Sequence, residues 1–160
     1  MGIQQTVSFY TNLMTNAHHY TDSGLTNVWL SNGFKERMIN GENAVSIADA
    51  DQLHEVIGRT LARKPHLTSS EFRFLRKELG LSQSRIGRIV GSSERTVALW
   101  ERRSKIPIAI QRLVKVIYLS RFGGNSAILD ALDRIMELDA QPDPDRFVFE
   151  ETQSGWKEAA

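Results

Sequence analysis

Residues 81–101 combine polar and basic side chains with small residues, at a spacing typical of two short helices joined by a tight turn. Gly87 stands where two such helices would cross closely, and Gly91 stands where the chain would turn sharply. Ser82 and Ser93 can each cap one helix. Four apolar side chains are spaced to share one core: Ile86, Val90, Val97 and Trp100. This pattern predicts a helix-turn-helix, whose second helix enters the major groove of DNA, whereas an ordinary helical hairpin in a bundle is the alternative.

The second helix, which begins at Ser93, would present its N-terminal face to base edges. Arg95 is expected to bind guanine O6 and N7 through two hydrogen bonds, worth about 1–3 kcal/mol of discrimination. Glu94 can accept from cytosine N4, and Ala98 and Leu99 can contact thymine methyl groups. Hydroxyl, amide and basic groups around both helices suit phosphate contacts: Ser82, Gln83, Arg85, Arg88, Ser93, Thr96, Arg102, Arg103 and Lys105. For each basic residue, a solvated surface cation is the alternative.

Charge is distributed unevenly along the 160 residues, although the net charge is only +1. Residues 59–121 contain 15 Lys/Arg and 4 Asp/Glu, whereas residues 1–58 contain 2 and 6, and residues 122–160 contain 3 and 9. A basic middle between acidic flanks favours an anionic partner, most often a nucleic acid. A salt-bridged helical surface is the alternative.

Other chemistries have weaker support. The chain has no cysteine, which excludes disulfides, thiol catalysis and thiolate zinc sites. Asp49 and Asp51 lie where a helix is expected to begin, a position that favours carboxylates without any catalytic role. The segment Gly123-Gly124-Asn125 lacks the pattern of a phosphate loop. The four histidines lack metal-ligand spacing with a carboxylate partner: His18, His19, His54 and His66. We therefore expect no enzyme activity, no metal and no cofactor.

The expected fold class is α+β, mainly α: a lambda-repressor-like helix-turn-helix bundle with a small N-terminal antiparallel β lobe and a C-terminal strand. Residues 1–24 show little periodicity and are expected to be loosely ordered. Residues 25–64 are expected to form the β lobe and a linking helix. Within the lobe, two Asn-Gly pairs, at 32–33 and 40–41, separate short apolar runs and predict an antiparallel meander over 27–47. Asp49 and Gln52 have capping-box spacing at the start of the linking helix, which should end before Pro65.

Residues 65–122 are expected to form the DNA-binding domain, which begins with a capping box at Thr68 and Glu71. The third helix of the chain has apolar residues at Ile86, Ile89 and Val90, and the fifth helix is expected to direct Leu113 inward. Residues 123–160 are expected to form a helix over 125–138 and a strand over 146–152. This strand could pair with the meander of its own chain or of a second subunit. The helix and strand are a candidate dimer interface, and completion of the monomer core is the alternative.

The segment LSQSRIGRIVGSSERTVALWE resembles the XRE (Cro/C1-type) helix-turn-helix regulators, over residues 68–121. Together with EFRFLRKELGLSQ it also resembles, over 25–121, the MqsA-like antitoxins and their stand-alone relatives. Many of these relatives hold the N-terminal lobe together with four zinc-bound cysteines, which this chain lacks. Many also carry Arg or Gln at the position of Leu99, so fewer hydrogen bonds to bases are expected here.

These observations predict a sequence-specific transcriptional regulator, acting as a dimeric (auto)repressor. A homodimer is expected to bind double-stranded DNA at a palindromic operator, because one recognition helix reads only a few base pairs. The alternative is an antitoxin of a type II toxin-antitoxin pair, which neutralises a protein toxin through its N-terminal lobe and autoregulates its operon. The sequence has neither a membrane-spanning run nor a signal-peptide layout, so we expect a cytoplasmic protein without membrane contact.

Overall fold

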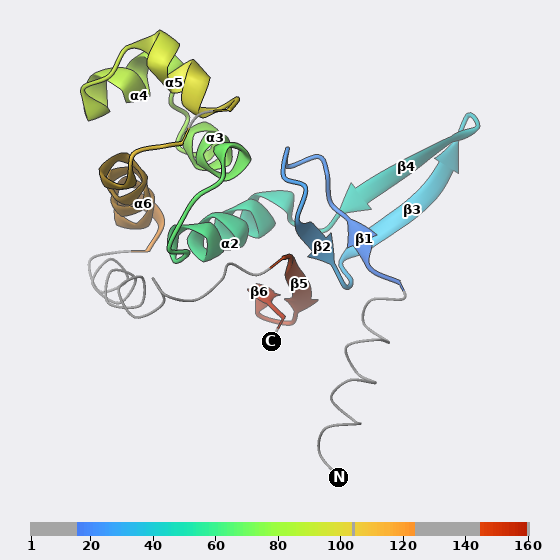
Figure 1. Ribbon diagram of the computed structural model, residues 1–160. Helices are drawn as coiled ribbons and strands as arrows, with labels where there is room; N and C mark the ends of the chain where they lie inside the picture. Colours follow the sequence, from blue (N-terminus) through green and yellow to red (C-terminus); the bar gives the residue numbers. More distant parts are fainter. Residues whose placement is uncertain (1–15, 104, 124–144, 160) are drawn as a thin grey trace.

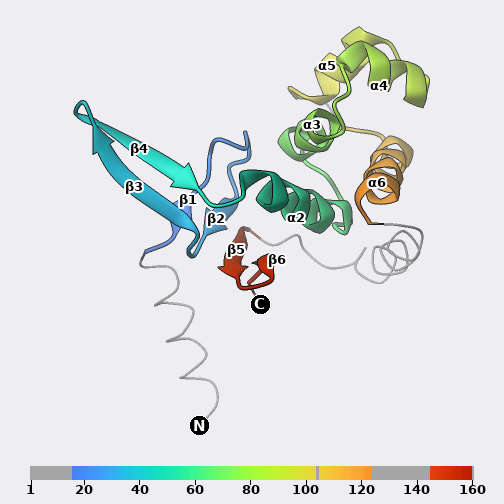
Figure 2. The same ribbon diagram turned by 180° about the vertical axis from the view of Figure 1, so that it is seen from behind.

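The computed structural model describes residues 16–103, 105–123 and 145–159, and Figures 1 and 2 show them from opposite sides. The fold is α+β and mainly helical, as the sequence predicts. The elements in chain order are β1 (His18–His19), β2 (Val28–Leu30), β3 (Phe34–Ile39), β4 (Glu42–Ile47), α2 (Ala50–Ala62), α3 (Ser69–Glu78), α4 (Gln83–Val90), α5 (Glu94–Trp100), α6 (Ile108–Phe122), β5 (Phe147–Thr152) and β6 (Gly155–Glu158).

Side-chain caps mark the starts of helices α2 to α5, and the sequence predicts these caps. Thr68 and Glu71 form the predicted capping box of α3, in which each side chain accepts from the other residue's backbone N–H. Ser82 caps α4 and Ser93 caps α5. Asp49 caps α2 by accepting from the backbone N–H of Gln52. These predicted helix starts are confirmed.

The hairpin of β3 and β4 forms a separate two-stranded antiparallel sheet. Its turn residues Asn40 and Gly41 both have positive φ, at 51° and 84°. Positive φ at both central positions is the requirement of a type I′ turn, which Asn-Gly satisfies at little steric cost. The second half of the predicted meander is therefore confirmed.

The first half of the predicted meander is wrong, because β2 does not pair with β3. Instead β2 lies between β1 and β5 in a four-stranded sheet of order β1-β2-β5-β6, and it runs parallel to β5. The pair Asn32-Gly33 connects β2 of the four-stranded sheet to β3 of the two-stranded sheet and does not form a hairpin turn. The Asn32 side chain accepts from the backbone N–H of Glu151 at 2.6 Å and donates to its carbonyl at 3.1 Å. Gly33 has a φ of 75° and lies against the indole of Trp156.

The first and last described segments of the chain, which contain β1, β5 and β6, belong to the β lobe. Within residues 16–24, which were predicted to be loosely ordered, β1 pairs with β2 and Tyr20 is buried. The strand predicted over 146–152 corresponds to β5, and it pairs with β2 of its own chain. The sequence reading did not predict β6, which carries the buried Trp156. Residues 1–15 and the helix predicted over 125–138 lie outside the described residues.

Helix α2 lies between the four-stranded sheet and the helices α3 and α6 (Figure 1), and one hydrophobic core extends across both sides. One apolar position predicted to face inward does not: Leu113 of α6 is 37% exposed. Ile89 of α4 is also on the surface, at 48% exposure. The short helix α4 buries only Ile86 and Gly87, since it packs mainly against α5. Within the described residues, no helix has both the length and the apolar composition needed to cross a membrane.

Candidate nucleic-acid interface

Helices α4 and α5 form the tight helical pair that the glycine spacing predicts. A Cβ atom at Gly87 would lie 2.6 Å from the carbonyl oxygen of Ser92, so only glycine fits without a shift of the backbone. Gly91 ends α4 in the left-handed region with a φ of 73°. The backbone N–H of Ser92 donates to the Gly87 carbonyl at 2.8 Å and closes the turn. Both glycines therefore have the structural roles expected of a helix-turn-helix.

One face of α5 is anchored in the core. Val97 is fully buried, and Trp100 is nearly so, with its ring edge-on to Phe72 of α3 at a centroid distance of 6.1 Å. Ile86 of α4 is also fully buried. Because this face points inward, the opposite face of α5 points to solvent (Figure 1).

The predicted base-reading residues lie on that outer face. Glu94, Arg95 and Leu99 are exposed, and Ala98 is half-buried. Arg95, Ala98 and Leu99 follow the i, i+3, i+4 spacing that places side chains on one side of a helix. Within the described part of the chain, no hydrogen bond or ion pair engages the side chain of Glu94 or Arg95. The structure therefore places these four residues on the part of α5 that faces away from the core, with Glu94 and Arg95 at its N-terminal end and Ala98 and Leu99 near its C-terminal end.

The predicted phosphate-binding hydroxyls already serve as helix caps. The Ser82 hydroxyl accepts from the backbone N–H of Arg85 at 3.1 Å. The Ser93 hydroxyl accepts from the backbone N–H of Thr96 at 3.1 Å, and the hydroxyls of Ser93 and Thr96 are 2.9 Å apart. Each cap leaves further N–H groups of the first helical turn without a helical acceptor, and these groups can bind phosphate oxygens.

Gln83 is placed differently from the prediction. Its amide nitrogen donates to the Glu101 carboxylate at 2.8 Å, so this group is already bonded rather than directed toward a phosphate. Arg76 of α3 donates to both oxygens of the same carboxylate and to the Leu81 carbonyl at 2.7 Å. Glu101 thereby connects the N-terminus of α4 and the C-terminus of α5 to α3. The sequence reading missed this link, although an arginine at position 76 on the apolar side of α3 was a signal that a buried carboxylate faces it.

The Glu101 carboxylate is charged because of these partners. Burial acts to raise its pKa, but hydrogen bonds from Arg76 and Gln83 and the positive charge of Arg76 outweigh burial, so the pKa lies below its ordinary value of 4.5. Its side chain is buried together with that of Arg76. The link therefore positions α5 rather than contacting a ligand.

Exposed cations lie on α4 and directly after α5. Five predicted phosphate contacts are exposed and form no ion pair with any residue that the structure describes: Arg85, Arg88, Arg102, Arg103 and Lys105. Three other basic residues of the 59–121 block are buried instead. Lys64 pairs with Glu71 at 2.8 Å, Lys115 donates to the Pro65 carbonyl at 2.9 Å, and Arg76 pairs with Glu101. The charge excess of this block is therefore partly structural and partly a surface property.

A cleft that the sequence reading missed adjoins these cations. It has a volume of about 550 Å³, and its lining includes Arg103, Lys105 and the first turn of α3 at Thr68 and Ser69. Among the residues that the structure describes, those lining the cleft include no Asp or Glu. The capping box at Thr68 was visible in the sequence, but the packing of the α5–α6 connection against it was not. A phosphate group suits this lining, since cations and helix N-termini both favour anions.

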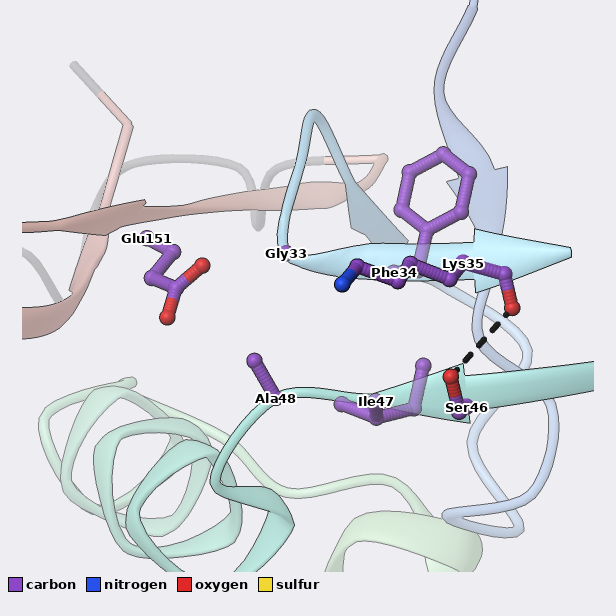
Figure 3. Close-up of a pocket in the computed structure, with 7 residues that line it drawn as sticks. All are labelled: Gly33, Phe34, Lys35, Ser46, Ile47, Ala48 and Glu151. Atoms are coloured by element: carbon purple, nitrogen blue, oxygen red, sulfur yellow. Dashed lines mark hydrogen bonds between the residues drawn. The ribbon is translucent and has the colours of Figure 1, made fainter.

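A second hollow, of about 330 Å³, lies in the β lobe at the base of the β3–β4 hairpin. Figure 3 shows Glu151 on one side of the hollow, with Ala48 and Ile47 on the other. Phe34 and Lys35 of β3 complete its lining. The hollow therefore combines an apolar surface with one carboxylate and one ammonium group.

The histidines have structural partners in this fold. His54 of α2 lies between the Tyr20 hydroxyl, at 2.8 Å, and the Glu78 carboxylate, at 2.9 Å. Burial and the negative charges of Asp22 and Glu78 raise the pKa of Tyr20. Among the residues that the structure describes, no three His, Asp or Glu side chains are grouped closely enough to hold a metal ion.

Comparisons with protein families, with curated proteins and with solved structures found no match for this chain.

Proposed function

We propose that this protein is a sequence-specific DNA-binding transcriptional regulator that inserts α5 into the major groove. The observation that carries the proposal is the outer face of α5: Glu94, Arg95, Ala98 and Leu99 lie together there, while Val97 and Trp100 anchor the opposite face. A helix held in this way can enter the groove without losing its packing. Arg95, which has no protein partner in the described structure, is proposed to read guanine.

The cations around α5 support the same proposal. Arg85 and Arg88 lie on α4, and Arg102, Arg103 and Lys105 follow α5, so exposed positive charge lies on the neighbouring helix and after the C-terminal end of the proposed recognition helix. Each cation that neutralises a phosphate releases counterions, which gives affinity that is independent of sequence and sensitive to salt. We propose that these residues hold the duplex while α5 reads it.

The proposed regulator is a cytoplasmic homodimeric repressor, with an operator in the DNA upstream of its own gene. A palindromic operator needs two recognition helices related by a two-fold axis. The proposed mechanism requires no catalytic group, metal or cofactor.

Fluorescence anisotropy tests this proposal. The purified full chain is titrated against a labelled duplex from upstream of its own gene, with unlabelled scrambled duplex as competitor, at two salt concentrations. Tight binding that resists the competitor is the expected result. Weak binding that depends strongly on salt and is indifferent to sequence would show a general anion surface and contradict specific regulation. Absence of binding would contradict DNA recognition altogether.

A second candidate function is neutralisation of a basic protein toxin by the β lobe. The observation that favours it is charge: residues 16–58 and 145–159 hold ten Asp/Glu and four Lys/Arg, opposite in sign to the helix-turn-helix. The hollow beside Glu151 lies in this acidic lobe (Figure 3). Co-expression with the product of a neighbouring reading frame tests it. Relief of growth arrest that Glu151→Lys abolishes and Arg95→Ala does not would support this function.

A further inference from the structure

The β3–β4 hairpin is a ribbon with two unpaired edges. It pairs with no further strand among the described residues, and it extends from the end of the molecule opposite to α6 and α4 (Figures 1 and 2). Met38 and Ile39 near its tip are 70% and 56% exposed. A two-stranded ribbon gains little stability by itself, because three or more strands are usually needed to cover an apolar face. The ribbon therefore offers its edges to a further strand.

The two edges differ in chemistry. The middle of β3 carries the exposed, charged side chains Lys35, Glu36 and Arg37. The middle of β4, residues 43–46, is Asn-Ala-Val-Ser and carries no charge. Charged side chains on an edge strand commonly prevent pairing with other strands, whereas an uncharged edge is a template for pairing. Of the two edges, β4 is the one without this protection.

Symmetry allows β4, but not β3, to pair with a copy of itself. When two identical strands pair antiparallel in one continuous sheet, a two-fold axis places one residue directly opposite itself. Near the middle of β3 that residue is Glu36 or Arg37, so like charges would lie opposite each other, which is destabilising. Near the middle of β4 it is Ala44 or Val45, which are small and uncharged.

The positions of the charges on the ribbon distinguish the two possible registers of β4. With Ala44 on the axis, Ser46 lies opposite the partner's Glu42. Since Ser46 also pairs with Lys35 within its own hairpin, Lys35 and the partner's Glu42 lie on either side of the short serine side chain. With Val45 on the axis, Ser46 lies opposite the partner's Ala44, which pairs with the partner's Arg37. The cross-strand row that starts at Lys35 then ends at an arginine, which has the same charge. The row on the axis does not distinguish the registers, because it ends at Arg37 of both copies in the Ala44 register and at Glu36 of both copies in the Val45 register. The rows through Ser46 therefore favour the Ala44 register.

We propose that β4 is a dimerisation edge, which pairs antiparallel with β4 of a second copy, with Ala44 on the two-fold axis. The product is a continuous four-stranded sheet of order β3-β4-β4-β3. This interface lies away from α4 and α5 and leaves the outer face of α5 accessible (Figure 1). The inference does not depend on DNA binding, so its failure and the failure of the proposed function are distinguishable.

The substitution Ala44→Glu tests the interface by charge. In its own hairpin the new carboxylate faces Arg37, so the ribbon should keep its fold, but on the axis it faces an identical carboxylate. Sedimentation velocity at several protein concentrations is expected to show a dimer for the unmodified chain and at least tenfold weaker dimerisation for Ala44→Glu. Met38→Glu adds the same charge to the β3 edge and should leave dimerisation unchanged. An equimolar mixture of Ala44→Glu and Ala44→Lys chains should recover the dimer.

Crosslinking provides a second readout, because the chain contains no cysteine. Residues directly opposite each other in antiparallel strands have Cβ atoms about 4.5–5.5 Å apart, close to the separation in a disulfide. Oxidised glutathione should therefore convert the Ala44→Cys chain to a covalent dimer and become reduced itself, whereas the Met38→Cys chain should stay largely monomeric in denaturing gels. A monomeric unmodified chain at every concentration would overturn the proposal. So would a dimer that Ala44→Glu does not weaken, or crosslinking that Met38→Cys matches.

Discussion

Arg95 and Glu101 lie near the two ends of α5 and differ in exposure and in hydrogen bonding. Arg95 is exposed and has no partner among the described residues, so its five N–H donors are available to a ligand. Glu101 is held by Arg76 and Gln83, and its side chain is buried, so it is not exposed to a ligand. At the residue scale, one side chain is expected to read bases and the other to hold the reading helix in place.

Replacing Arg95 with alanine is expected to reduce the preference for the specific site, not the fold. Loss of a two-bond guanine contact should weaken specific binding by roughly 5- to 150-fold, corresponding to about 1–3 kcal/mol, with little change in the affinity for scrambled DNA. Anisotropy titrations with both duplexes measure the difference. Arg146→Ala, an exposed arginine of the β lobe, is the matched control. Equal losses for the two variants would contradict the placement of Arg95 in the groove.

The Glu101 link predicts a pH dependence of stability. Since the pKa of Glu101 is lowered in the folded chain, the unfolded chain binds more protons in acid. Its contribution should be fully present above pH 4.5, the ordinary pKa of the group, and should be lost as the pH falls through the folded value. Urea unfolding of Glu101→Gln should show a free energy of unfolding that is lower by about 3 kcal/mol at neutral pH. Below pH 4.5 the free energy of unfolding of this variant should depend less on pH than that of the unmodified chain.

Glu94→Gln is the control for this pH effect, because Glu94 is an exposed carboxylate of the same helix without a described partner. It should retain the acid response of the unmodified chain. If Glu101→Gln retained that response as well, another carboxylate would be responsible for it.

At the scale of elements, α2 joins the β lobe to the helical bundle. Its side chains face the core on both sides, and Gln52 extends to β6, where it accepts from the Trp156 backbone N–H at 2.7 Å. The reciprocal half of the predicted capping box at Asp49 is absent, since the Gln52 side chain is used in this contact. On the other side, α6 approaches so closely that the Tyr118 ring lies against the backbone at Gly58.

This close approach predicts that Gly58→Ala destabilises the protein. A glycine in a helix interior normally costs about 1 kcal/mol relative to alanine, so helix propensity alone predicts a gain. However, a Cβ atom at this position would lie 2.0 Å from the Tyr118 hydroxyl oxygen, and the tyrosine is fully buried. Overpacking of about 1–3 kcal/mol should therefore exceed the gain. Thermal or urea unfolding measures the sign.

Tyr118→Leu supplies the control, because it removes the ring from the Gly58 position. In that background, Gly58→Ala should cost less than in the unmodified chain, as expected for two residues in contact. Equal costs in both backgrounds would contradict the steric explanation.

At the scale of the whole molecule, charge is separated between two regions. The β lobe is acidic and the helix-turn-helix is basic, so the net charge of +1 hides two surfaces of opposite sign. For the proposed DNA binding, such a separation is expected to orient the helix-turn-helix toward the anionic duplex and the β lobe away from it. The lobe is then available for another partner, including a second copy of this chain.

Arg102→Ala with Arg103→Ala should weaken binding to all duplexes alike. If each arginine neutralises one phosphate, the slope of log affinity against log salt should fall in magnitude by about 2. The ratio of specific to scrambled affinity should change little. Anisotropy titrations at four salt concentrations give the slope. An unchanged slope would show that these two arginines do not contact the duplex.

The sequence by itself determined the local features of this protein. Capping residues, apolar spacing and turn residues act within a few positions of the chain, so they predicted the starts of α2 to α5, the turn at Asn40-Gly41 and the roles of Gly87 and Gly91. The outer face of α5 followed from helical periodicity for the same reason.

Only the tertiary structure decided which distant segments meet. The parallel pairing of β2 with β5 joins residues more than a hundred positions apart, and no local pattern distinguishes it from the meander that the Asn32-Gly33 pair suggested. Packing also decided which basic residues are buried: Lys64 and Lys115 have the same side chain as exposed lysines, and only their neighbours supply the oxygens that hold them. Helix caps and turns depend on neighbouring residues, so the sequence predicts them. Strand register and side-chain burial depend on which distant segments pack into the same core.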